Sequence, residues 1–465
     1  MTRSRVLLTA ALAVVVAGLL AVGAVLPVAG PVGAATSVPA VAGAGGVVCP
    51  LGDTVAGAEL DLVLAAPAAT GDAVAARTTE VVVGATPSRT APPAVPAGGV
   101  RGVPLDVAAD GTTWVGWADA PVVAWRDWRR PAAPGLPRGR AGGPCVGADA
   151  TTWHVVGLRT DGGSEARLRF ANPFGVDATL AVDLVTTEGT VRPLALQNLS
   201  VPARGTADLR VNDHVPERPD VAAIVRVTSG RAAVEGLQLA LAGIGGVDGL
   251  TLVPPATAAA RDWTLPWVPG ADDARVWVLN PSERDVELEV TVHAADGPGL
   301  PPGPETLAVA AGALVRVGAA DLVPAGTAAV GVSLRSPTDP VVVGGALRID
   351  PGDAARSGIA ALPALAAGDT GWLVAGRAED GRTRTLRLVN VHTDAVRVSI
   401  ELRTPDSPPR ALSEVEVPAG ARRDVVLPAG DVGAFAAEVT ADGPVVVALS
   451  ELGAPVPDPV VTAGV

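Results

Sequence analysis

The sequence contains no lysine, so all 35 of its basic residues are arginines. This absence excludes active sites that need a lysine amine, namely the phosphate-binding P-loop, the Ser-x-x-Lys nucleophile and Schiff-base catalysis. The Gly-x-Ser-x-Gly motif of serine hydrolases is absent too. The four histidines lack the spacing of metal ligands: His154, His214, His293 and His392. We therefore predict no catalytic, metal-binding or cofactor-binding residue, no cofactor, and a protein that is not an enzyme.

Aromatic residues are scarce, because tyrosine is absent and only three phenylalanines accompany the nine tryptophans. Alanine and valine must therefore fill the cores of this 465-residue chain, which is long enough for three or four domains. Acidic residues outnumber basic ones by 48 to 35, which gives a net charge of −13. Since such a surface repels phosphate groups, we predict no nucleic-acid partner.

Only the N-terminus carries a long uncharged apolar run. Arg3 and Arg5 precede 21 uncharged residues, Val6 to Leu26, which would span ~31 Å as a helix. This pattern is typical of an export signal, and it places everything after residue 36 outside the cytoplasm. Small residues near Ala35 suit signal-peptidase cleavage. Two alternatives stay open: a signal peptide that is cleaved near Ala35, or an uncleaved helix that anchors the protein in the cytoplasmic membrane.

Cysteine is nearly absent, and the two that occur are Cys49 and Cys145. Without a Cys-x-x-Cys motif, neither a redox site nor a zinc cluster is available. Outside the cytoplasm two lone cysteines usually pair. We therefore predict a disulfide between them.

The rest of the chain repeats one unit of about 108 residues. A tryptophan recurs at intervals of 110 and 109 residues, at Trp153, Trp263 and Trp372. An asparagine recurs at intervals of 108 and 110 residues, at Asn172, Asn280 and Asn390. Segments 177–186, 285–294 and 395–404 alternate apolar and polar residues, as half-buried strands do. The sequence predicts an all-β fold of four tandem Ig-like antiparallel β-sandwich units behind an N-terminal hydrophobic helix.

We divide the chain at the breaks in this repeat. The predicted segments are a signal peptide or anchor (1–36), a flexible tether (37–47), a degenerate unit one with the disulfide (48–148), and units two (149–259), three (260–368) and four (369–465). The recurring asparagine ends an apolar strand and is followed by proline in two copies. Asparagine followed by proline is typical of a turn, so we interpret this asparagine as turn architecture rather than chemistry.

One segment, residues 114–140, departs from the repeat. It holds four of the nine tryptophans and five arginines in an otherwise acidic chain. Exposed indole rings and forked guanidinium groups would suit an anionic polymer. The predicted recognition surface comprises Trp125, Trp128, Arg126, Arg129 and Arg130. The alternative is that the tryptophans fill a core and the arginines are solvated in a loop.

The segments "TTWHVVGL" (151–158), "RLRFANP" (167–173) and "VPARG" (201–205) follow Cys145 in order. In this arrangement the chain resembles exported, single-anchor actinobacterial proteins that are classified only as a domain of unknown function, and its units resemble bacterial Ig-like repeats. The resemblance implies a location in the cell envelope. It assigns no activity to the chain, because none is established for that family.

The leading functional hypothesis is a non-enzymatic extracytoplasmic protein of the cell envelope that acts as a scaffold, spacer or protein-interaction partner. The alternative is a module that binds an envelope polysaccharide or another anionic polymer through unit one. A hydrolase with a cleft at a domain junction is a third, less favoured hypothesis. Expected partners are envelope proteins or anionic glycans, and the membrane if the N-terminal helix is uncleaved.

Overall fold

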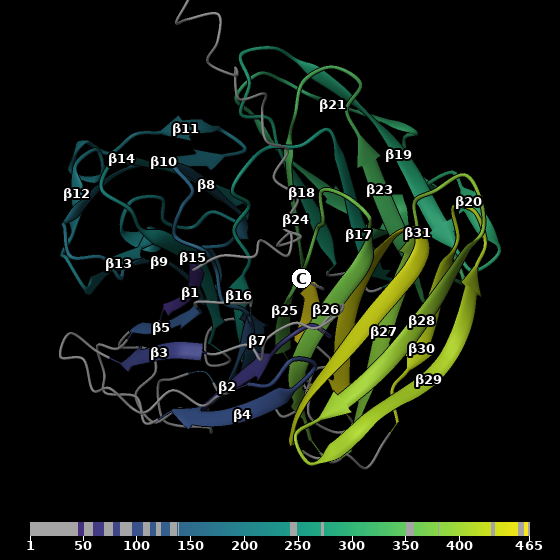
Figure 1. Ribbon diagram of the computed structural model, residues 1–465. Helices are drawn as coiled ribbons and strands as arrows, with labels where there is room; N and C mark the ends of the chain where they lie inside the picture. Colours follow the sequence, from purple (N-terminus) through teal and green to yellow (C-terminus); the bar gives the residue numbers. More distant parts are fainter. Residues whose placement is uncertain are drawn as a thin grey trace, which may run out of the picture. The chain divides into compact units, whose positions relative to one another are not determined.

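The computed structural model describes residues 45–50, 59–68, 78–83, 95–105, 112–117, 122–130, 137, 139–241, 249–270, 274–349, 358–379, 381–428, 433–453 and 460–463 (Figure 1). The described residues all belong to one compact unit. The predicted N-terminal helix lies outside the described residues, as does most of the predicted tether. Among the described residues, no helix has both the length and the apolar character that crossing a membrane requires.

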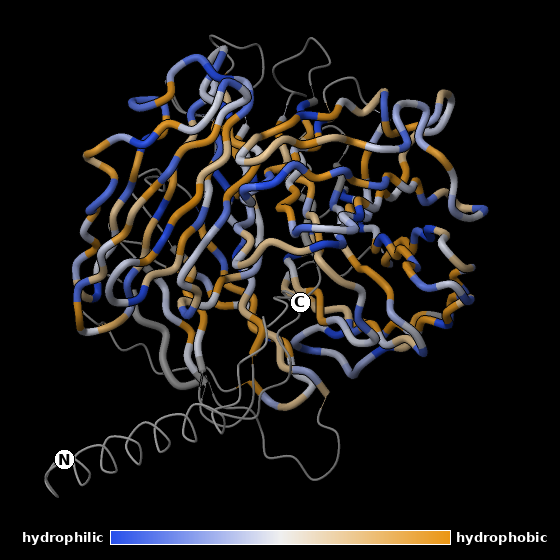
Figure 2. The backbone as a smooth tube through the Cα atoms, turned by 90° about the horizontal axis from the view of Figure 1, so that it is seen from above, coloured by the Kyte–Doolittle hydropathy of each residue, from blue (hydrophilic) through white to orange (hydrophobic). Residues whose placement is uncertain are grey.

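The described part is all-β, as predicted, and its strands form antiparallel sheets. Short helical turns interrupt them at η2 (Leu194–Leu196), η3 (Val211–Asp213) and α3 (Ala319–Leu322). Figure 2 shows hydrophobic residues running along the strands and hydrophilic residues gathering at many of the connecting turns.

Sheet pair 1 is our name for the sheets β1-β5-β3 and β4-β2-β6-β7. Its strands are β1 (Gly45–Pro50), β2 (Glu59–Ala65), β3 (Thr78–Val83), β4 (Val100–Leu105), β5 (Thr112–Trp117), β6 (Val123–Arg130) and β7 (Gly139–Pro144). Because β1 begins at Gly45, the last residues of the predicted tether belong to a strand.

Sheet pair 2 comprises the sheets β11-β10-β14-β8, with β12 also on β10, and β13-β9-β15-β16. Its strands are β8 (Thr152–Leu158), β9 (Ser164–Asn172), β10 (Ala178–Thr186), β11 (Gly189–Val191), β12 (Leu199–Val201), β13 (Gly205–Arg210), β14 (Val221–Ser229), β15 (Ala233–Ala240) and β16 (Gly249–Val253).

Sheet pair 3 has the same plan, with the sheets β17-β23-β19-β20, with β21 also on β19, and β22-β18-β24-β25. Its strands are β17 (Asp262–Pro269), β18 (Arg275–Leu279), β19 (Val286–Ala294), β20 (Gly297–Gly299), β21 (Thr306–Val309), β22 (Leu314–Gly318), β23 (Ala329–Arg335), β24 (Val342–Ile349) and β25 (Gly358–Leu362).

Sheet pair 4 differs because one strand runs through both of its layers. The first half of β31 pairs with β26 and β28, and its second half pairs with β27 and β32. The strands are β26 (Asp369–Ala378), β27 (Arg382–Asn390), β28 (Val396–Thr404), β29 (Ser407–Val417), β30 (Arg422–Val426), β31 (Gly433–Gly453) and β32 (Val460–Ala463).

The two layers of a sheet pair share one apolar core. In sheet pair 2, Trp153 on β8 and Leu180 on β10 belong to the same cluster as Leu168 on β9 and Val234 on β15. Comparable clusters join the layers of sheet pairs 3 and 4, and the core of sheet pair 1 contains both cysteines. Alternation along each strand supplies these inward-facing residues. The Ig-like assignment and the four domain boundaries stay predictions.

The last strand of each sheet pair also contacts its neighbours. β7 packs beside β16, and β16 beside β25 (Figure 1). β32 packs beside both β25 and β7. The backbone N–H of Ala361 on β25 donates a 3.0 Å hydrogen bond to Thr251 Oγ1 on β16. These contacts connect the first sheet pair to the last, so strand β6, next to β7, is packed on several sides.

Candidate functional site at strand β6

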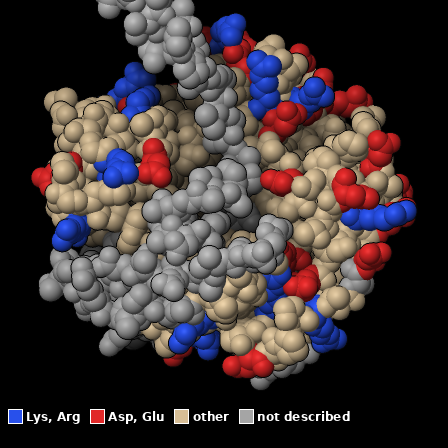
Figure 3. Space-filling view, viewed as in Figure 1, with Lys and Arg blue, Asp and Glu red and all other residues tan. Residues whose placement is uncertain are grey.

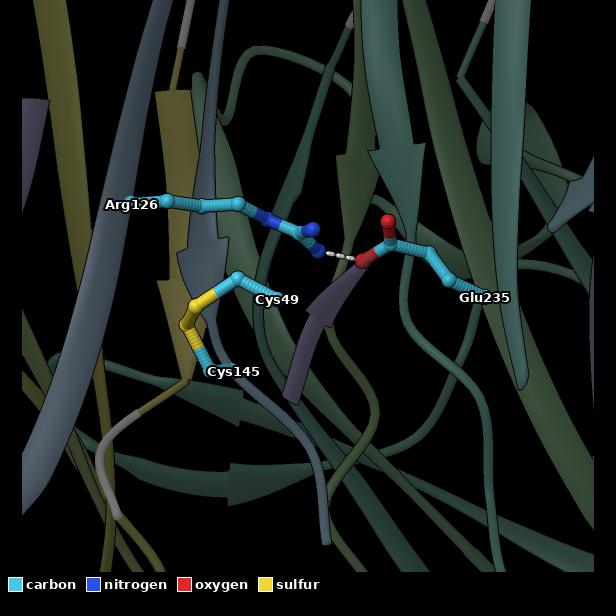
Figure 4. Close-up of a disulfide and its surroundings, with 4 residues drawn as sticks. All are labelled: Cys49, Arg126, Cys145 and Glu235. Atoms are coloured by element: carbon cyan, nitrogen blue, oxygen red, sulfur yellow. Dashed lines mark ion pairs between the residues drawn. A yellow bond between two sulfur atoms is a disulfide. The ribbon is translucent and has the colours of Figure 1, made fainter. Parts of the chain in front are cut away.

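The disulfide crosslinks the first sheet pair next to β6. Cys49 on β1 and Cys145, which directly follows β7, are bonded and buried, with their Cα atoms 4.7 Å apart (Figure 4). Val48 and Val146 exchange two backbone hydrogen bonds of 2.7 and 2.9 Å beside it. The predicted pairing is confirmed, and it links the two sheets of sheet pair 1.

Trp125 was predicted as part of an exposed surface, but only 2% of it is exposed. Its indole packs beside Val63 on the adjacent strand β2 and against Leu373 and Ala436 of sheet pair 4. The prediction is corrected because β6 has neighbours on its faces as well as along its edges. Sheet pair 4, which is remote in sequence, covers the face of β6 that carries Trp125.

Trp128 is likewise buried, with 3% exposed, and it contacts sheet pair 2 instead. Its ring packs against Leu237 on β15 and Leu250 on β16. The Arg169 guanidinium lies over the ring, 5.1 Å from its centroid, in a cation–π contact. The two tryptophans therefore join sheet pair 1 to two different sheet pairs.

Arg126 forms a buried ion pair with Glu235 on β15, and Figure 4 shows the two side chains meeting near the disulfide. Burial lowers the pKa of Arg126 to about 9, with the positive charge of nearby Arg169 acting in the same direction. The guanidinium is still protonated at neutral pH, so the contact stays ionic. This ion pair is a second contact of a charged side chain between sheet pairs 1 and 2, besides that of Arg169 with Trp128.

Asp127 and Arg140 form a charged cluster with Glu451 on β31. Arg140 donates 2.6 Å hydrogen bonds to Asp127 Oδ1, to Glu451 Oε2 and to the backbone carbonyl of Arg377. Burial raises the pKa of Asp127 and of Glu451, although Arg140 opposes that rise. For Arg140 the neighbouring carboxylates outweigh burial and raise the pKa. We call Asp127, Arg140 and Glu451 the charged clasp.

Arg129 and Arg130 complete the predicted surface. Arg129 keeps 26% of its side chain exposed, and it pairs with Asp61 on β2 and, at 3.4 Å, with Glu379. Arg130 is buried. Of the five residues predicted to form a recognition surface, only Arg129 is therefore partly accessible, and binding by it stays a prediction.

A different tryptophan of the same segment is half-buried. Trp114 on β5 meets Phe174 edge-to-face, with ring centroids 5.9 Å apart. The Phe174 ring also contacts Arg231, whose guanidinium lies 3.5 Å from the ring centroid. This aromatic group lies where sheet pairs 1 and 2 meet. Composition pointed to the segment, but it did not distinguish this tryptophan from the buried ones.

The recurring asparagine is turn architecture, as predicted. Asn172 Oδ1 accepts the backbone N–H of Phe174 at 3.0 Å, and its Nδ2 donates to the carbonyl of Val176 at 2.8 Å. Asn280 and Asn390 make the same two kinds of contact in sheet pairs 3 and 4. All three are buried, so their amides serve the backbone.

One arrangement that sequence reasoning missed has the layout of a nucleophile and its base. His293 Nε2 lies 2.7 Å from Ser333 Oγ, and its Nδ1 lies 2.7 Å from the carbonyl of Gly420. Burial lowers the pKa of His293. The equivalent positions of sheet pair 2, counted by strand register, hold Val185 and Ile224, which pack against sheet pair 3. This locus is therefore a contact between sheet pairs, and hydrogen bonding there serves packing.

No cluster of three or more potential metal ligands occurs among the described residues. The model of a family described as a family of unknown function (DUF5719) matches residues 126–371, more than half of the chain. No curated protein matches.

Two solved structures show similarity to part of the chain. Thermotoga maritima 1070 is 21% identical, with 21% of this chain and 94% of that one covered and a TM-score of 0.20. The Anabaena sensory rhodopsin transducer is 23% identical, with 18% of this chain and 95% of that one covered and a TM-score of 0.16. At such scores neither similarity transfers a fold or a function.

Proposed function

The chain belongs to this family of unknown function, and we propose that it is a non-enzymatic, extracytoplasmic protein of the cell envelope that acts as a scaffold or protein-interaction partner. The observation that carries the proposal is the use made of β6. Its two tryptophans and its charged residues, the most distinctive side chains of the sequence, bind other parts of the same chain. Such contacts stabilise a rigid body rather than a binding cleft.

The disulfide supports the extracytoplasmic location. A disulfide between two buried cysteines forms and persists in oxidising compartments, and it is rare in the cytoplasm. Arg3 and Arg5 before the apolar run support export, with the N-terminal helix either cleaved near Ala35 or retained as a single anchor. The proposal includes four Ig-like sandwich units, because paired antiparallel sheets with shared cores suit that architecture.

The location is tested by fusing a phosphatase that is active only outside the cytoplasm after residue 465. We expect an active phosphatase, together with protection of Cys49 and Cys145 from alkylation in the exported protein. An inactive phosphatase, with activity instead from a cytoplasmic reporter at the same position, would contradict the location.

The partner role is tested by crosslinking in intact cells, followed by mass spectrometry. We expect crosslinks from the protein to other envelope proteins, made at residues other than Trp125 and Trp128, which are buried. The variant Leu194→Ala, at an exposed turn, serves as a folded control. Crosslinks confined to copies of the chain itself would contradict the partner role.

A second candidate, an envelope polysaccharide-binding module, is favoured by one observation: the half-buried Trp114–Phe174–Arg231 group. Aromatic faces stack on sugar rings, and an adjacent guanidinium binds carboxylates. On the face shown in Figure 3, basic and acidic side chains are interspersed, so a broad cationic surface is not the basis of this candidate. Loss of glycan binding in Phe174→Ala, with binding kept in Leu194→Ala, would support it.

A further inference from the structure

A cavity of about 160 Å³ lies between the two sheets of sheet pair 3. Both sheets and the short helix α3 contribute to its wall. The apolar part of the wall consists of Val276, Val290, Pro304, Leu307, Val317, Leu322 and Leu334. Arg316 and Asp321 lie at the same cavity.

The cavity exists because sheet pair 3 carries smaller side chains than sheet pair 2 at matching positions. Val276 lies four residues before Asn280, and Leu168 lies four residues before Asn172. Val276 faces Val317 across β18 and β22, whereas Leu168 faces Leu209 across β9 and β13. Two leucines in one core are thus two valines in the other.

A second difference lies in the segment that closes the same end of the core. Leu199 pairs with β10 as Leu307 pairs with β19, which matches the two strands β12 and β21. Three residues before Leu199, Leu196 is buried in the core of sheet pair 2. Three residues before Leu307 stands Pro304, which is exposed. Sheet pair 3 therefore lacks the side chain that fills this space in sheet pair 2.

The positive charge at the cavity is compensated. Arg316 Nη1 lies 3.3 Å from both carboxylate oxygens of Asp220, a residue of sheet pair 2. Asp220 Oδ1 also accepts the indole N–H of Trp277 at 2.7 Å, which fixes its position. With Arg316 neutralised by Asp220 and Asp321 exposed nearby, the entrance offers hydrogen-bonding groups without a net attraction for anions.

We propose that this cavity is a binding site for a small uncharged molecule that carries a compact hydrocarbon group of about six carbons, such as an aromatic ring. An engineered apolar cavity of about 150 Å³ binds benzene, so the volume suits a group of that size. The apolar wall contributes affinity through burial of hydrocarbon, and Arg316 and Asp321 can hydrogen bond a hydroxyl at the entrance.

The test uses benzyl alcohol as the probe, with benzoate as its anionic analogue, on the protein with its disulfide intact. Binding is followed by the change in melting temperature and by NMR shifts of the valine methyl groups. We expect benzyl alcohol to raise the melting temperature and to shift the resonances of Val276 and Val317. Benzoate, whose carboxylate would lie beside Asp321, should bind at least about tenfold more weakly, the loss that 1.4 kcal/mol produces.

Two filling variants, Val317→Leu and Pro304→Leu, restore the side-chain types of sheet pair 2 and should each weaken binding of benzyl alcohol by at least about tenfold. Val426→Leu, which adds the same methylene at an exposed position, is the matched control and should bind as the wild type does. The proposal is overturned if benzyl alcohol causes no shift up to its solubility limit, if both filling variants bind it unchanged, or if benzoate binds more tightly.

Discussion

Arg140 and Glu451 are 311 residues apart in the sequence, yet Arg140 Nη1 donates a 2.6 Å hydrogen bond to Glu451 Oε2 in the interior of the protein. The contact connects β7 of the first sheet pair to β31 of the last. Asp127 accepts a second hydrogen bond from the same guanidinium, so one arginine is shared by two buried carboxylates. The charged clasp therefore couples the two ends of the described chain.

Removing one partner of this clasp should be costly. In Glu451→Ala, Arg140 keeps Asp127 but loses a buried carboxylate, and we expect the free energy of unfolding to fall by about 3–5 kcal/mol. Glu59, whose side chain is 74% exposed and lies 3.5 Å from Arg129, is the matched control. Glu59→Ala should change stability by less than about 1 kcal/mol. Equal losses in the two variants, measured by urea denaturation, would contradict the role of the clasp.

The disulfide should stabilise the protein by constraining the unfolded chain. Cys49 and Cys145 are 96 residues apart, and for a loop of that length the entropic model gives on the order of 4–5 kcal/mol. We expect the double variant Cys49→Ser, Cys145→Ser to melt at a distinctly lower temperature by calorimetry. An unchanged melting temperature would show that the closed loop contributes nothing to stability.

Trp128→Ala should destabilise the protein rather than alter a surface. The indole lies between sheet pairs 1 and 2 and beneath Arg169, so its loss leaves a cavity and should cost about 3–5 kcal/mol. Leu194, which is 88% exposed, is the control, and Leu194→Ala should stay within about 0.5 kcal/mol of the wild type. Chemical denaturation compares the two, and a wild-type midpoint for Trp128→Ala would mean that the ring is not part of the core.

The burial of Trp128 also shows what the sequence could not predict. The alternation of apolar residues and the turn residues predicted the all-β fold, because strands and turns depend on local sequence. The presence of only two cysteines, in a chain expected to be exported, predicted the disulfide. Whether the face of a strand meets water depends on remote segments, and here Leu237 and Leu373 cover β6 from two sides. Neither contact leaves a signal near residue 125.

The same limit applies to the charged residues. Five arginines between residues 114 and 140 suggested a cationic surface, because pairing with Glu235 and Glu451 cannot be inferred from spacing. The half-buried Trp114 was within the predicted segment, but only the packing of sheet pairs distinguishes it from Trp125 and Trp128.

Buried His154 should make stability depend on pH. Burial lowers its pKa to about 4, with Arg226 acting in the same direction and a hydrogen bond with the Ala256 backbone opposing it. Between pH 6.5 and 4 the unfolded chain takes up a proton at this residue and the folded protein does not. Stability from this residue is therefore complete above pH 6.5 and declines as the pH falls, by about 3 kcal/mol in total.

Melting temperatures of the wild type and His154→Gln between pH 7 and pH 4 measure this decline. The variant should lose less stability over that range, and His392→Gln, at an exposed position, should follow the wild type. Carboxyl groups whose pKa is held low by arginines, such as Asp183, add a further loss at lower pH in all three proteins. Parallel curves for the wild type and His154→Gln would contradict the assignment.

The last prediction concerns the recurring asparagine, for which a structural role in the turn and a role in recognition lead to opposite results. Asn280 Nδ2 donates to the carbonyls of Arg284 and Val309 at 2.7 and 3.1 Å, and its Oδ1 accepts the backbone N–H of Ser282 at 3.0 Å. Asn280→Ala removes these three hydrogen bonds, of which the one to Val309 is buried, and should cost about 2–4 kcal/mol. In sheet pair 1, Ala66 occupies the same place: it is buried, and its backbone N–H donates to the carbonyl of Gly99 as that of Asn280 donates to Ala313.

The variant Asn280→Asp tests the donor role of the side chain separately from its acceptor role. The carboxylate keeps the hydrogen bond from Ser282, but it faces the carbonyl oxygens of Arg284 and Val309 and cannot donate to them when ionised. Its pKa should be raised, so this variant should gain stability on acidification, as the protonated carboxyl donates again, and lose it as the pH rises. Thermal melts at pH 4 and pH 7 test this, with Asn280→Ala as the reference that lacks a titratable group. If Asn280→Ala kept the wild-type melting temperature but lost partner crosslinks, the asparagine would be a recognition residue and not part of the turn.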